Sequence, residues 1–411
     1  MAGTGSDDPV IVVGAGLAGL ACATTLHRAG RPVRVIEASD GVGGRVRTDV
    51  VDGFRLDRGF QVLLTAYPEA HRQLDLDALE LRRFDPGALV HLGTESSVVA
   101  DPFRAPGRLL EAVRSPAAGP IDKLRIALLR RRVRSVHPAT LLRGEDVSTL
   151  DALRADGFSE RAIERLFTPL FGGIQLDPSL STSRRMFDVI FRMLADGDSA
   201  VPAAGMQAMP EQLAAALPDG AVELGCRVVG VGPGVVRTDD GELNASEVVV
   251  ACEGPAAADL LGLPPVGSHP AGAVYFAADE PPTDERLVVL DGRGGPVLNA
   301  AVMSNVAPEY APPGRHLVVA ALPGVVEGDL VSVARRAMRE WWGDRVGSWD
   351  HLATYRIPHG QPVQRPPFSP KQRTRIADGL HVCGDHRDTA SIQGALHSGR
   401  RCGEAVVASL T

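Results

Sequence analysis

The sequence contains few aromatic residues, almost no lysine and no excess of positive charge. Phe, Trp and Tyr make up 4% of the 411 residues, and 43 basic residues stand against 50 acidic ones, which gives a net charge of −7. Because no positive field surrounds the whole chain, we expect no binding to DNA or RNA. Only Lys123 and Lys371 are lysines, so chemistry that needs a lysine amine has few candidate residues.

Cysteines are also few, and they are widely spaced. Their odd number and the absence of a CxxC pair argue against a disulfide framework and against a zinc site. We therefore predict no bound metal ion. The five cysteines are Cys22, Cys226, Cys252, Cys383 and Cys402.

Long hydrophobic runs are missing as well. The longest apolar stretch, residues 10–26, is rich in Gly and Ala and is too short to predict a membrane span. Residues 1–10 are polar and acidic, without the basic segment that begins a secretory signal. We therefore expect a cytoplasmic protein, and the length predicts two or three structural units at roughly 100–200 residues per domain.

Glycine, in contrast, is abundant, and its first cluster follows a short apolar run. The β-branched residues Val10–Val13 predict a buried parallel strand, which leads directly into Gly14-Ala15-Gly16-Leu17-Ala18-Gly19. A helical pattern follows and ends at Gly30. A second strand, Val33–Ile36, ends at Glu37. This order of strand, GxGxxG, helix, strand and acidic residue is typical of a dinucleotide-binding βαβ unit.

Each part of this motif has a physical role. Gly14 permits a tight turn, Gly16 lets the backbone approach a pyrophosphate, and Gly19 allows the helix to pack closely against the sheet. The helix N-terminus offers N–H groups and a positive dipole to phosphates. Glu37, which precedes Ala38, is placed to accept hydrogen bonds from ribose hydroxyls and would repel a 2′-phosphate, which disfavours NADP.

Three further segments carry a family resemblance. The first is a second glycine loop, and the other two lie near the C-terminus. They contain Gly43-Gly44-Arg45 followed by Gly59-Phe60-Gln61, then His381-Val382-Cys383-Gly384-Asp385, and then Ser391-Ile392-Gln393-Gly394-Ala395. Together with the N-terminal motif, they resemble the superfamily of FAD-dependent amine oxidases, phytoene desaturases and protoporphyrinogen oxidases.

The resemblance implies that the chain binds FAD non-covalently. Gly43, Gly44 and Arg45 would lie along the pyrophosphate and the ribityl chain, and Gly384 with Asp385 would contact the same part of the cofactor. The segment that ends at residues 59–61 would run towards the flavin ring.

Three other positions are implied in the same way. The first N–H groups of the final helix, near Ile392, would face the flavin pyrimidine carbonyl, where the helix dipole stabilises reduced flavin. Val228 matches the family position whose backbone contacts adenine. For Gln61 two interpretations stay open, a contact with the flavin edge or substrate and a purely structural role.

These features predict an α/β fold with two interleaved domains. A Rossmann-like FAD-binding domain, similar to that of glutathione reductase, is expected from residues 7–80, 201–254 and 370–411. An α+β substrate domain is expected from residues 81–200, which show helical patterns, and residues 255–369, which contain strands separated by proline-rich connectors.

The resemblance also implies an FAD-dependent oxidoreductase of oxidase or desaturase type, with oxygen or another molecule as electron acceptor. Amine oxidases of the family place a lysine near flavin N5, and none lies between Val274 and Val302. Ser391 stands where many of them carry Tyr or Trp. These departures, together with Phe167–Leu176, favour a small, hydrophobic organic substrate. An amine oxidase and a redox-neutral isomerase remain alternatives, and no catalytic side chain is assigned.

One helical segment, Ile121–Arg134, contains six basic residues and one acidic residue. Its apolar residues predict a single hydrophobic face. A substrate-domain helix with a solvated arginine face is the favoured interpretation, and contact with an anionic membrane surface is the alternative. The apolar residues of the predicted face are Ile121, Leu124, Leu128, Leu129 and Val133.

Overall fold

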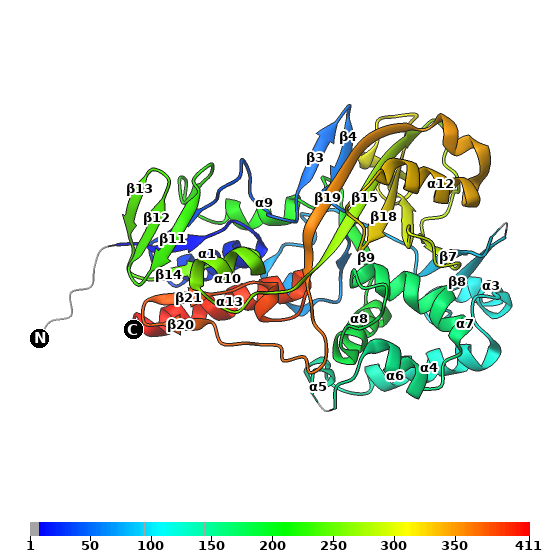
Figure 1. The fold of residues 1–411 in the computed structure, drawn as a ribbon, viewed down its shortest axis with the longest axis horizontal. Helices are drawn as coiled ribbons and strands as arrows, with labels where there is room; N and C mark the ends of the chain where they lie inside the picture. Colours follow the sequence, from blue (N-terminus) through cyan, green and yellow to red (C-terminus); the bar gives the residue numbers. More distant parts are fainter. Residues whose placement is uncertain (1–7, 94, 144) are drawn as a thin grey trace, which may run out of the picture.

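The computed structural model describes residues 8–93, 95–143 and 145–411, so residues 1–7 of the polar N-terminal stretch lie outside it. The described chain has a mixed α/β fold that is drawn out along one axis (Figure 1). One end holds a sheet with helices packed on it, together with the C-terminus. The other end holds a second sheet beside a group of helices.

The first sheet is parallel except at one edge. Every residue of its central strands β1 and β14 is buried, as expected where helices cover both faces. Its strands come from three distant segments of the chain, and only β20 and β21 pair in antiparallel fashion. In spatial order the strands are β10 (Val222–Glu223), β2 (Val33–Ile36), β1 (Val10–Val13), β14 (Val248–Val250), β21 (Leu380–Val382) and β20 (Arg375–Ala377).

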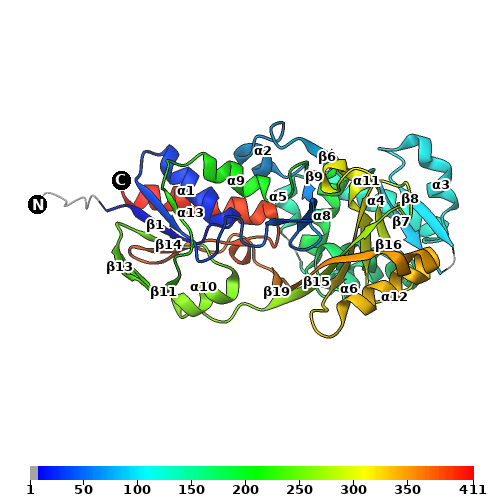
Figure 2. The same cartoon turned by 90° about the horizontal axis from the view of Figure 1, so that it is seen from above.

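Helices cover both faces of this sheet. They are α1 (Leu17–Arg28), α2 (Pro68–Gln73), α9 (Ala208–Ala215), α10 (Gly254–Leu261) and α13 (Ile392–Ser409). Figure 2 shows α1, α9 and α13 on one side of the sheet and α10 on the other. The helix predicted after the first glycine cluster is confirmed, and it ends just before Gly30, whose φ is +74°. α1 and α13 approach closely, since a Cβ on Gly399 would lie 2.1 Å from the Ala18 carbonyl oxygen.

Two smaller antiparallel structures extend from this unit. The hairpin of β3 (Thr48–Val51) and β4 (Phe54–Asp57) closes through Asp52 and Gly53, with φ angles of +49° and +82°. Positive φ at both positions is the signature of a tight two-residue turn. The predicted turn at Gly241 is also confirmed. It joins two of the strands β11 (Val228–Gly232), β12 (Val235–Thr238) and β13 (Gly241–Asn244).

The second sheet has seven strands and is covered on one face by α12 (Leu330–Trp342). The sequence pattern had indicated only strands in this part of the chain. α12 forms because Leu330, Ala334, Ala337 and Met338 recur at helical spacing and are all buried. In spatial order the strands are β19 (Asp350–Pro362), β15 (Ser268–Ala278), β18 (His316–Pro323), β17 (Asn299–Val302), β16 (Val288–Asp291), β7 (Gly87–His91) and β8 (Ser96–Ala100).

Short elements connect the two sheets. Their strands β5 (Leu63–Leu64), β9 (Ser199–Pro202) and β6 (Leu81–Arg83) form a three-stranded sheet. Five short helices of the described chain lie outside both the first sheet's cover and the helical group described next. They are η1 (Pro106–Arg108), α11 (Met303–Val306), η3 (Pro308–Tyr310), η4 (Gly343–Ser348) and η5 (Asp385–Arg387).

A group of helices lies beside the second sheet. It comprises α3 (Leu109–Arg114), α4 (Pro120–Arg134), α5 (Pro138–Leu141), α6 (Thr149–Ala155), α7 (Glu160–Ala162), the π-helix η2 (Ile163–Gly172) and α8 (Arg184–Asp196). The prediction of one apolar face on α4 is wrong. Leu129 and Val133 are buried because they face the neighbouring helices. Ile121, Leu124 and Leu128 do not face them and are 55% to 64% exposed.

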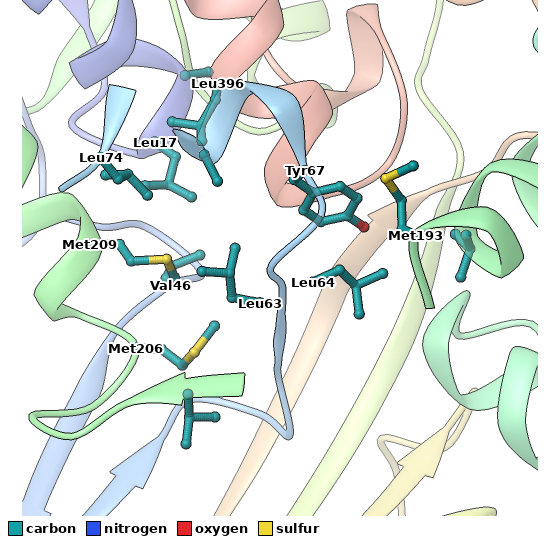
Figure 3. Packing of buried hydrophobic residues seen from close by; sticks show 14 of the residues in the cluster. Leu17, Val46, Leu63, Leu64, Tyr67, Leu74, Met193, Met206, Met209 and Leu396 are labelled. Carbon is teal, nitrogen blue, oxygen red and sulfur yellow. The ribbon is translucent and has the colours of Figure 1, made fainter. Parts of the chain in front are cut away.

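The main hydrophobic core continues from the first sheet into the helical group. Figure 3 shows the strand β5 and the residues that follow it crossing this core. Leu63 lies beside Val46 and Met209, whereas Leu64 lies beside Tyr67 on the side of Met193. Because consecutive strand residues point in opposite directions, this short segment ties the two ends of the molecule together.

Candidate active site

A cavity of about 1070 Å³ extends from the first glycine loop to the helical group. All the residues predicted to bind the cofactor line it except Ala15 and Gly19. The fold therefore gathers three distant parts of the chain around one space. The predicted residues that line the cavity are Gly14, Gly16, Leu17, Ala18, Glu37, Ala38, Gly43, Gly44, Arg45, Gly59, Phe60, Gln61, Val228, Gly384, Asp385 and Ile392.

The three glycines of the first loop have different surroundings. Gly14 has a φ of +109°, and a Cβ there would lie 3.0 Å from the Ala251 carbonyl oxygen. A Cβ on Gly19 would lie only 1.9 Å from the Gly14 carbonyl oxygen, so this residue serves the close packing of α1 and does not line the cavity. A Cβ on Gly16 would meet no described atom within 4 Å. Gly16 therefore leaves space on the cavity side for a ligand.

The carboxylate of Glu37 is held at the edge of the cavity by backbone groups. Its Oε2 accepts a hydrogen bond of 2.8 Å from the Ala15 N–H, and its Oε1 accepts bonds from the Ser39 N–H and hydroxyl at 2.9 and 2.8 Å. Ala15 thus orients Glu37 and does not face the cavity itself. The remaining lone pairs of the carboxylate can accept hydrogen bonds from ribose hydroxyls.

The second glycine loop lies beside the first. The Gly43 N–H donates to the Ala15 carbonyl oxygen at 2.8 Å, and Gly43 pairs with Gly16 in an isolated bridge. Arg45 donates to the Gly360 carbonyl oxygen and to Asp385 Oδ1, both at 2.8 Å. This partly buried ion pair joins the second loop to the C-terminal segment, so a pyrophosphate between them would meet a glycine backbone and a guanidinium.

The final helix begins at the cavity, as predicted. Ser391 precedes α13, and its hydroxyl accepts the Gly394 N–H at 3.1 Å. The earlier N–H groups, at Ile392 and Gln393, have no carbonyl partner within the helix. Since Ser391 and Ile392 both line the cavity, these groups and the helix dipole can face a negatively charged ligand.

Gln61 makes structural contacts and also lines the cavity. Its Nε2 donates to the Arg45 carbonyl oxygen at 2.8 Å and to the Arg58 carbonyl oxygen at 3.1 Å. These two bonds hold the second glycine loop against the segment that follows β4.

The outer part of the cavity, within the helical group, is mainly apolar. The rings of Phe171 and Phe191 are nearly parallel, with centroids 6.1 Å apart, and Phe167 stacks beside Phe171. A side-chain set of this kind favours a ligand with a large apolar surface. The large apolar residues here are Phe103, Leu109, Val113, Ile126, Leu166, Phe167, Leu170, Phe171, Ile190, Phe191 and Leu194.

The one cavity-lining lysine already has partners. Lys123 Nζ donates to the carbonyl oxygens of Val113 and Ser115 at 2.6 and 2.7 Å, and burial lowers its pKa. These bonds tie α4 to the end of α3. Nearby, Arg130 lies 3.4 Å from the Asp101 carboxylate.

Asn299 is a candidate site residue that sequence reasoning missed. It lies on the buried strand β17, lines the cavity and is 5% exposed. Its Nδ2 makes a long hydrogen bond of 3.4 Å to the Pro169 carbonyl oxygen, and its Oδ1 has no hydrogen-bond partner among the described residues. The only signal was one amide within the apolar run 297–302. A buried, unpaired acceptor in a cavity can orient a bound ligand.

A buried carboxylate, that of Asp57, lies at the end of β4, directly before the loop of residues 58–61. Asp57 is 2% exposed and accepts hydrogen bonds from the Thr48 hydroxyl at 2.6 Å, the Met206 N–H at 2.9 Å and the Tyr310 hydroxyl at 2.9 Å. Burial raises the pKa of Asp57 to about 6, although these donors oppose the shift.

We expect Asp57→Asn to be more stable than the wild type at about pH 8, by about 3 kcal/mol, and equally stable below about pH 4. The folded pKa of Asp57 lies above the ordinary value of 3.8. The folded state therefore binds this proton more tightly, and stability falls as the pH rises through about 6. Without a buried charge, the asparagine Oδ1 can still accept from the Thr48 hydroxyl and the Met206 N–H, and its Nδ2 can donate to the Tyr310 hydroxyl oxygen. Thermal unfolding midpoints at the two pH values test this, and a difference that does not change with pH would contradict it.

Among the residues that the structure describes, no group of three or more His, Cys, Asp or Glu side chains is arranged to hold a metal ion. The C-terminal His381 pairs instead with Glu247, at 2.9 Å.

The parallel sheet, the paired glycine loops and the cavity between them define a protein of the dinucleotide-binding class. The sequence model of the family described as flavin containing amine oxidoreductase matches residues 17–407. The chain belongs to this family, and membership in it implies FAD as the cofactor.

Individual relatives differ in the chemistry that their names state. A phytoene dehydrogenase from Streptomyces griseus is 30% identical over 295 residues, which are 64% of this chain and 57% of that protein. A putrescine oxidase from Kocuria rosea is 41% identical over 95 residues, which are 23% of this chain and 20% of that protein. The chain thus spans little more than half the length of the first relative and a fifth of the second.

Solved structures share the fold at low sequence identity. An oxidoreductase from Methanosarcina mazei is 18% identical with a TM-score of 0.76, covering 96% of this chain and 100% of that one. Cyclohexylamine oxidase from Brevibacterium oxydans IH-35A is 15% identical with a TM-score of 0.72, covering 98% of this chain and 99% of that one.

Proposed function

We propose that the protein dehydrogenates an organic, largely hydrophobic substrate, with FAD bound non-covalently as the hydride acceptor. The observation that carries this proposal is the continuity of the cavity, since its glycine-rich end leads directly into the apolar outer part around Phe171 and Phe191. A desaturase needs such a space, because an apolar substrate is held by burial of its surface.

In this proposal the chain forms two interleaved domains. Residues 7–80, 201–254 and 370–411 form a Rossmann-like FAD-binding domain similar to that of glutathione reductase, and residues 81–200 and 255–369 form the substrate domain. The strands of the parallel sheet, which come only from the first set of segments, support this division. Asp7 lies outside the described residues.

The protein's own groups would bind and orient the reactants. The space at Gly16 and the Arg45–Asp385 pair would hold the pyrophosphate, and Glu37 would hold the ribose. The N-terminus of α13 would stabilise negative charge on the ring. Bound FAD would supply the hydride acceptor at N5, with oxygen or another molecule taking up the electrons. The aromatic residues of the outer cavity would exclude water.

An amine remains the second candidate for the substrate. Two carboxylates, Asp85 and Asp101, line the outer cavity and could attract a cation, although Asp101 already faces Arg130. The apolar reading is favoured because the one lysine in the cavity, Lys123, is bound to backbone carbonyls. The match to a phytoene dehydrogenase also covers more of the chain than the match to a putrescine oxidase.

Anaerobic mixing of the holoenzyme with candidate substrates tests the proposal. We expect the visible absorbance of the oxidised flavin to fall when apolar substrates that can gain a conjugated double bond are added. It should remain when aliphatic amines are added. Reduction by amines alone would favour the amine oxidase. Turnover of a substrate only after the flavin has been reduced, with no net redox change, would favour an isomerase, and either result would overturn the proposed dehydrogenation.

A further inference from the structure

Exposed apolar side chains are concentrated in one part of the surface. Of the eleven large hydrophobic residues that are exposed in the described chain, seven lie between residues 103 and 128, with exposed fractions of 49% to 65%. Such a concentration is unusual for a surface that faces only water. We call these seven residues the apolar patch. They are Phe103, Leu109, Leu110, Val113, Ile121, Leu124 and Leu128.

Six of the seven residues of the apolar patch lie on the helices α3 and α4, which are joined by hydrogen bonds. Ile121, Leu124 and Leu128 follow at spacings of three and four residues, so they lie on one face of α4, while Leu129 and Val133 face the core. Lys123 binds the carbonyl oxygens at the end of α3. Figure 2 shows α3 at the end of the molecule that is farthest from the C-terminus.

Part of the apolar patch lies at a mouth of the cavity. Phe103, Leu109 and Val113 line the cavity and are at the same time 65%, 49% and 60% exposed. Ile126 and Ala127, on the inner side of α4, line the cavity as well. An apolar molecule on this surface could therefore reach the outer cavity without crossing bulk water.

The charges around the apolar patch are mostly positive, although the whole chain carries −7. Arg114 and Arg131 are exposed and form no ion pair with another described residue. In contrast, Arg132 and Arg134 on the same helix are paired with Asp188 and Asp196.

The acidic residues near these arginines do not cancel them. Asp122 is buried and bound to Ser159, which leaves Glu111 as the exposed carboxylate of α3 and α4. Apolar side chains with arginines at their border are complementary to an interface of acyl chains and phosphate groups.

We propose that the apolar patch docks on the surface of a lipid bilayer that contains anionic lipids, with the cavity mouth facing the bilayer. Docking would be peripheral, because no helix in the described part of the chain is long and apolar enough to cross a membrane. The inference concerns a surface and not the reaction, so it can be tested without a substrate.

The test uses sedimentation of the holoenzyme with vesicles. Vesicles of phosphatidylcholine with about one third phosphatidylglycerol should bind the wild type, and pure phosphatidylcholine should bind it more weakly. The variant Ile121→Ser/Leu124→Ser/Leu128→Ser, none of which lines the cavity, should bind at least about tenfold more weakly. Its matched control, Val50→Ser/Leu224→Ser/Val229→Ser, removes three exposed apolar residues from other regions and should bind like the wild type.

A second pair of variants tests the charges. Arg114→Gln/Arg131→Gln should weaken binding to the anionic vesicles about 30-fold, because each arginine contributes roughly 1 kcal/mol. Arg28→Gln/Arg336→Gln, at exposed sites elsewhere, should not. Flavin spectra and circular dichroism check that each variant is folded. If the triple serine variant does not fold, the double arginine variant still tests the proposal.

Three results would overturn the proposal. They are a wild type that binds neither vesicle, patch variants that bind as well as their controls, and a patch that mediates self-association while the vesicles stay free. The last result would identify a second copy of the chain as the occupant of the apolar patch.

Discussion

Gly16→Ala is expected to lower the affinity for FAD by about 100-fold, which corresponds to about 2.7 kcal/mol, while the apoprotein stays folded. The backbone of Gly16, with φ −74° and ψ 175°, is accessible to alanine. The new Cβ would meet no described atom within 4 Å and would occupy the space on the cavity side of the loop. A pyrophosphate would then be displaced from the N–H groups of α1, and each such charge-assisted bond contributes about 1.5–3 kcal/mol.

Two other glycines make this result interpretable. Gly107→Ala also adds a Cβ with no described atom within 4 Å, but outside the cavity lining, and should leave FAD binding unchanged. Gly19→Ala would place a Cβ 1.9 Å from the Gly14 carbonyl oxygen and should lower the unfolding midpoint as well. Titration of apoprotein with FAD, together with thermal unfolding, separates the three. If the affinity of Gly16→Ala for FAD is within about twofold of the wild-type affinity, the pyrophosphate does not bind at this loop.

Asn299→Leu is expected to slow flavin reduction by the substrate about 30-fold with no change in FAD affinity. Leucine has the same branching at Cγ and the same number of side-chain heavy atoms as asparagine but offers no acceptor, so a substrate oriented by Oδ1 would lose its partner. The long bond to the Pro169 carbonyl oxygen is too weak to make the variant unstable. Anaerobic stopped-flow measurement of flavin reduction, with a substrate found as described above, gives the rate.

Gln175→Leu provides the matched control. Gln175 is 3% exposed, neither its Oε1 nor its Nε2 has a hydrogen-bond partner in the described chain, and it does not line the cavity. Both substitutions remove a buried amide whose oxygen is unpaired, and only the one in the cavity should affect the rate. If Asn299→Leu reduces the flavin as fast as Gln175→Leu does, Asn299 has no role in orienting the substrate.

The glycine loops could be predicted because their requirements are local. A strand that leads into GxGxxG and a helix needs a tight turn at Gly14 and no side chain at Gly16, whatever the rest of the chain does. The same holds for the beginning of α13 at Ser391. The Ser391 hydroxyl caps this helix by accepting a hydrogen bond from the N–H of Gly394, three residues later. Even so, the role of Ala15 was not visible, because its N–H binds a carboxylate that lies 22 residues away.

The outer cavity could not be predicted in the same way. Its walls come from α3, α4, η2, α8 and β17, whose shared property in the sequence is only that they contain apolar residues. Asn299 became a candidate only when its unpaired oxygen was seen inside a cavity. The sequence showed in advance that no lysine lies in the flavin region. It did not show that Lys123 lies at the cavity, or that its amine is already bound to backbone carbonyls.

What the sequence determined by itself was the family, the cofactor and the glycine-rich half of the cavity, because short backbone motifs carry them. Periodicity also predicted the helix α4, but it could not tell which of its apolar residues would be covered. The neighbours of α4 come from distant parts of the chain, and they bury Leu129 and Val133 while leaving Ile121, Leu124 and Leu128 exposed. Only the tertiary structure decided that the scarce exposed hydrophobic residues would meet at the mouth of the cavity, since exposure depends on which surfaces the folded chain leaves uncovered.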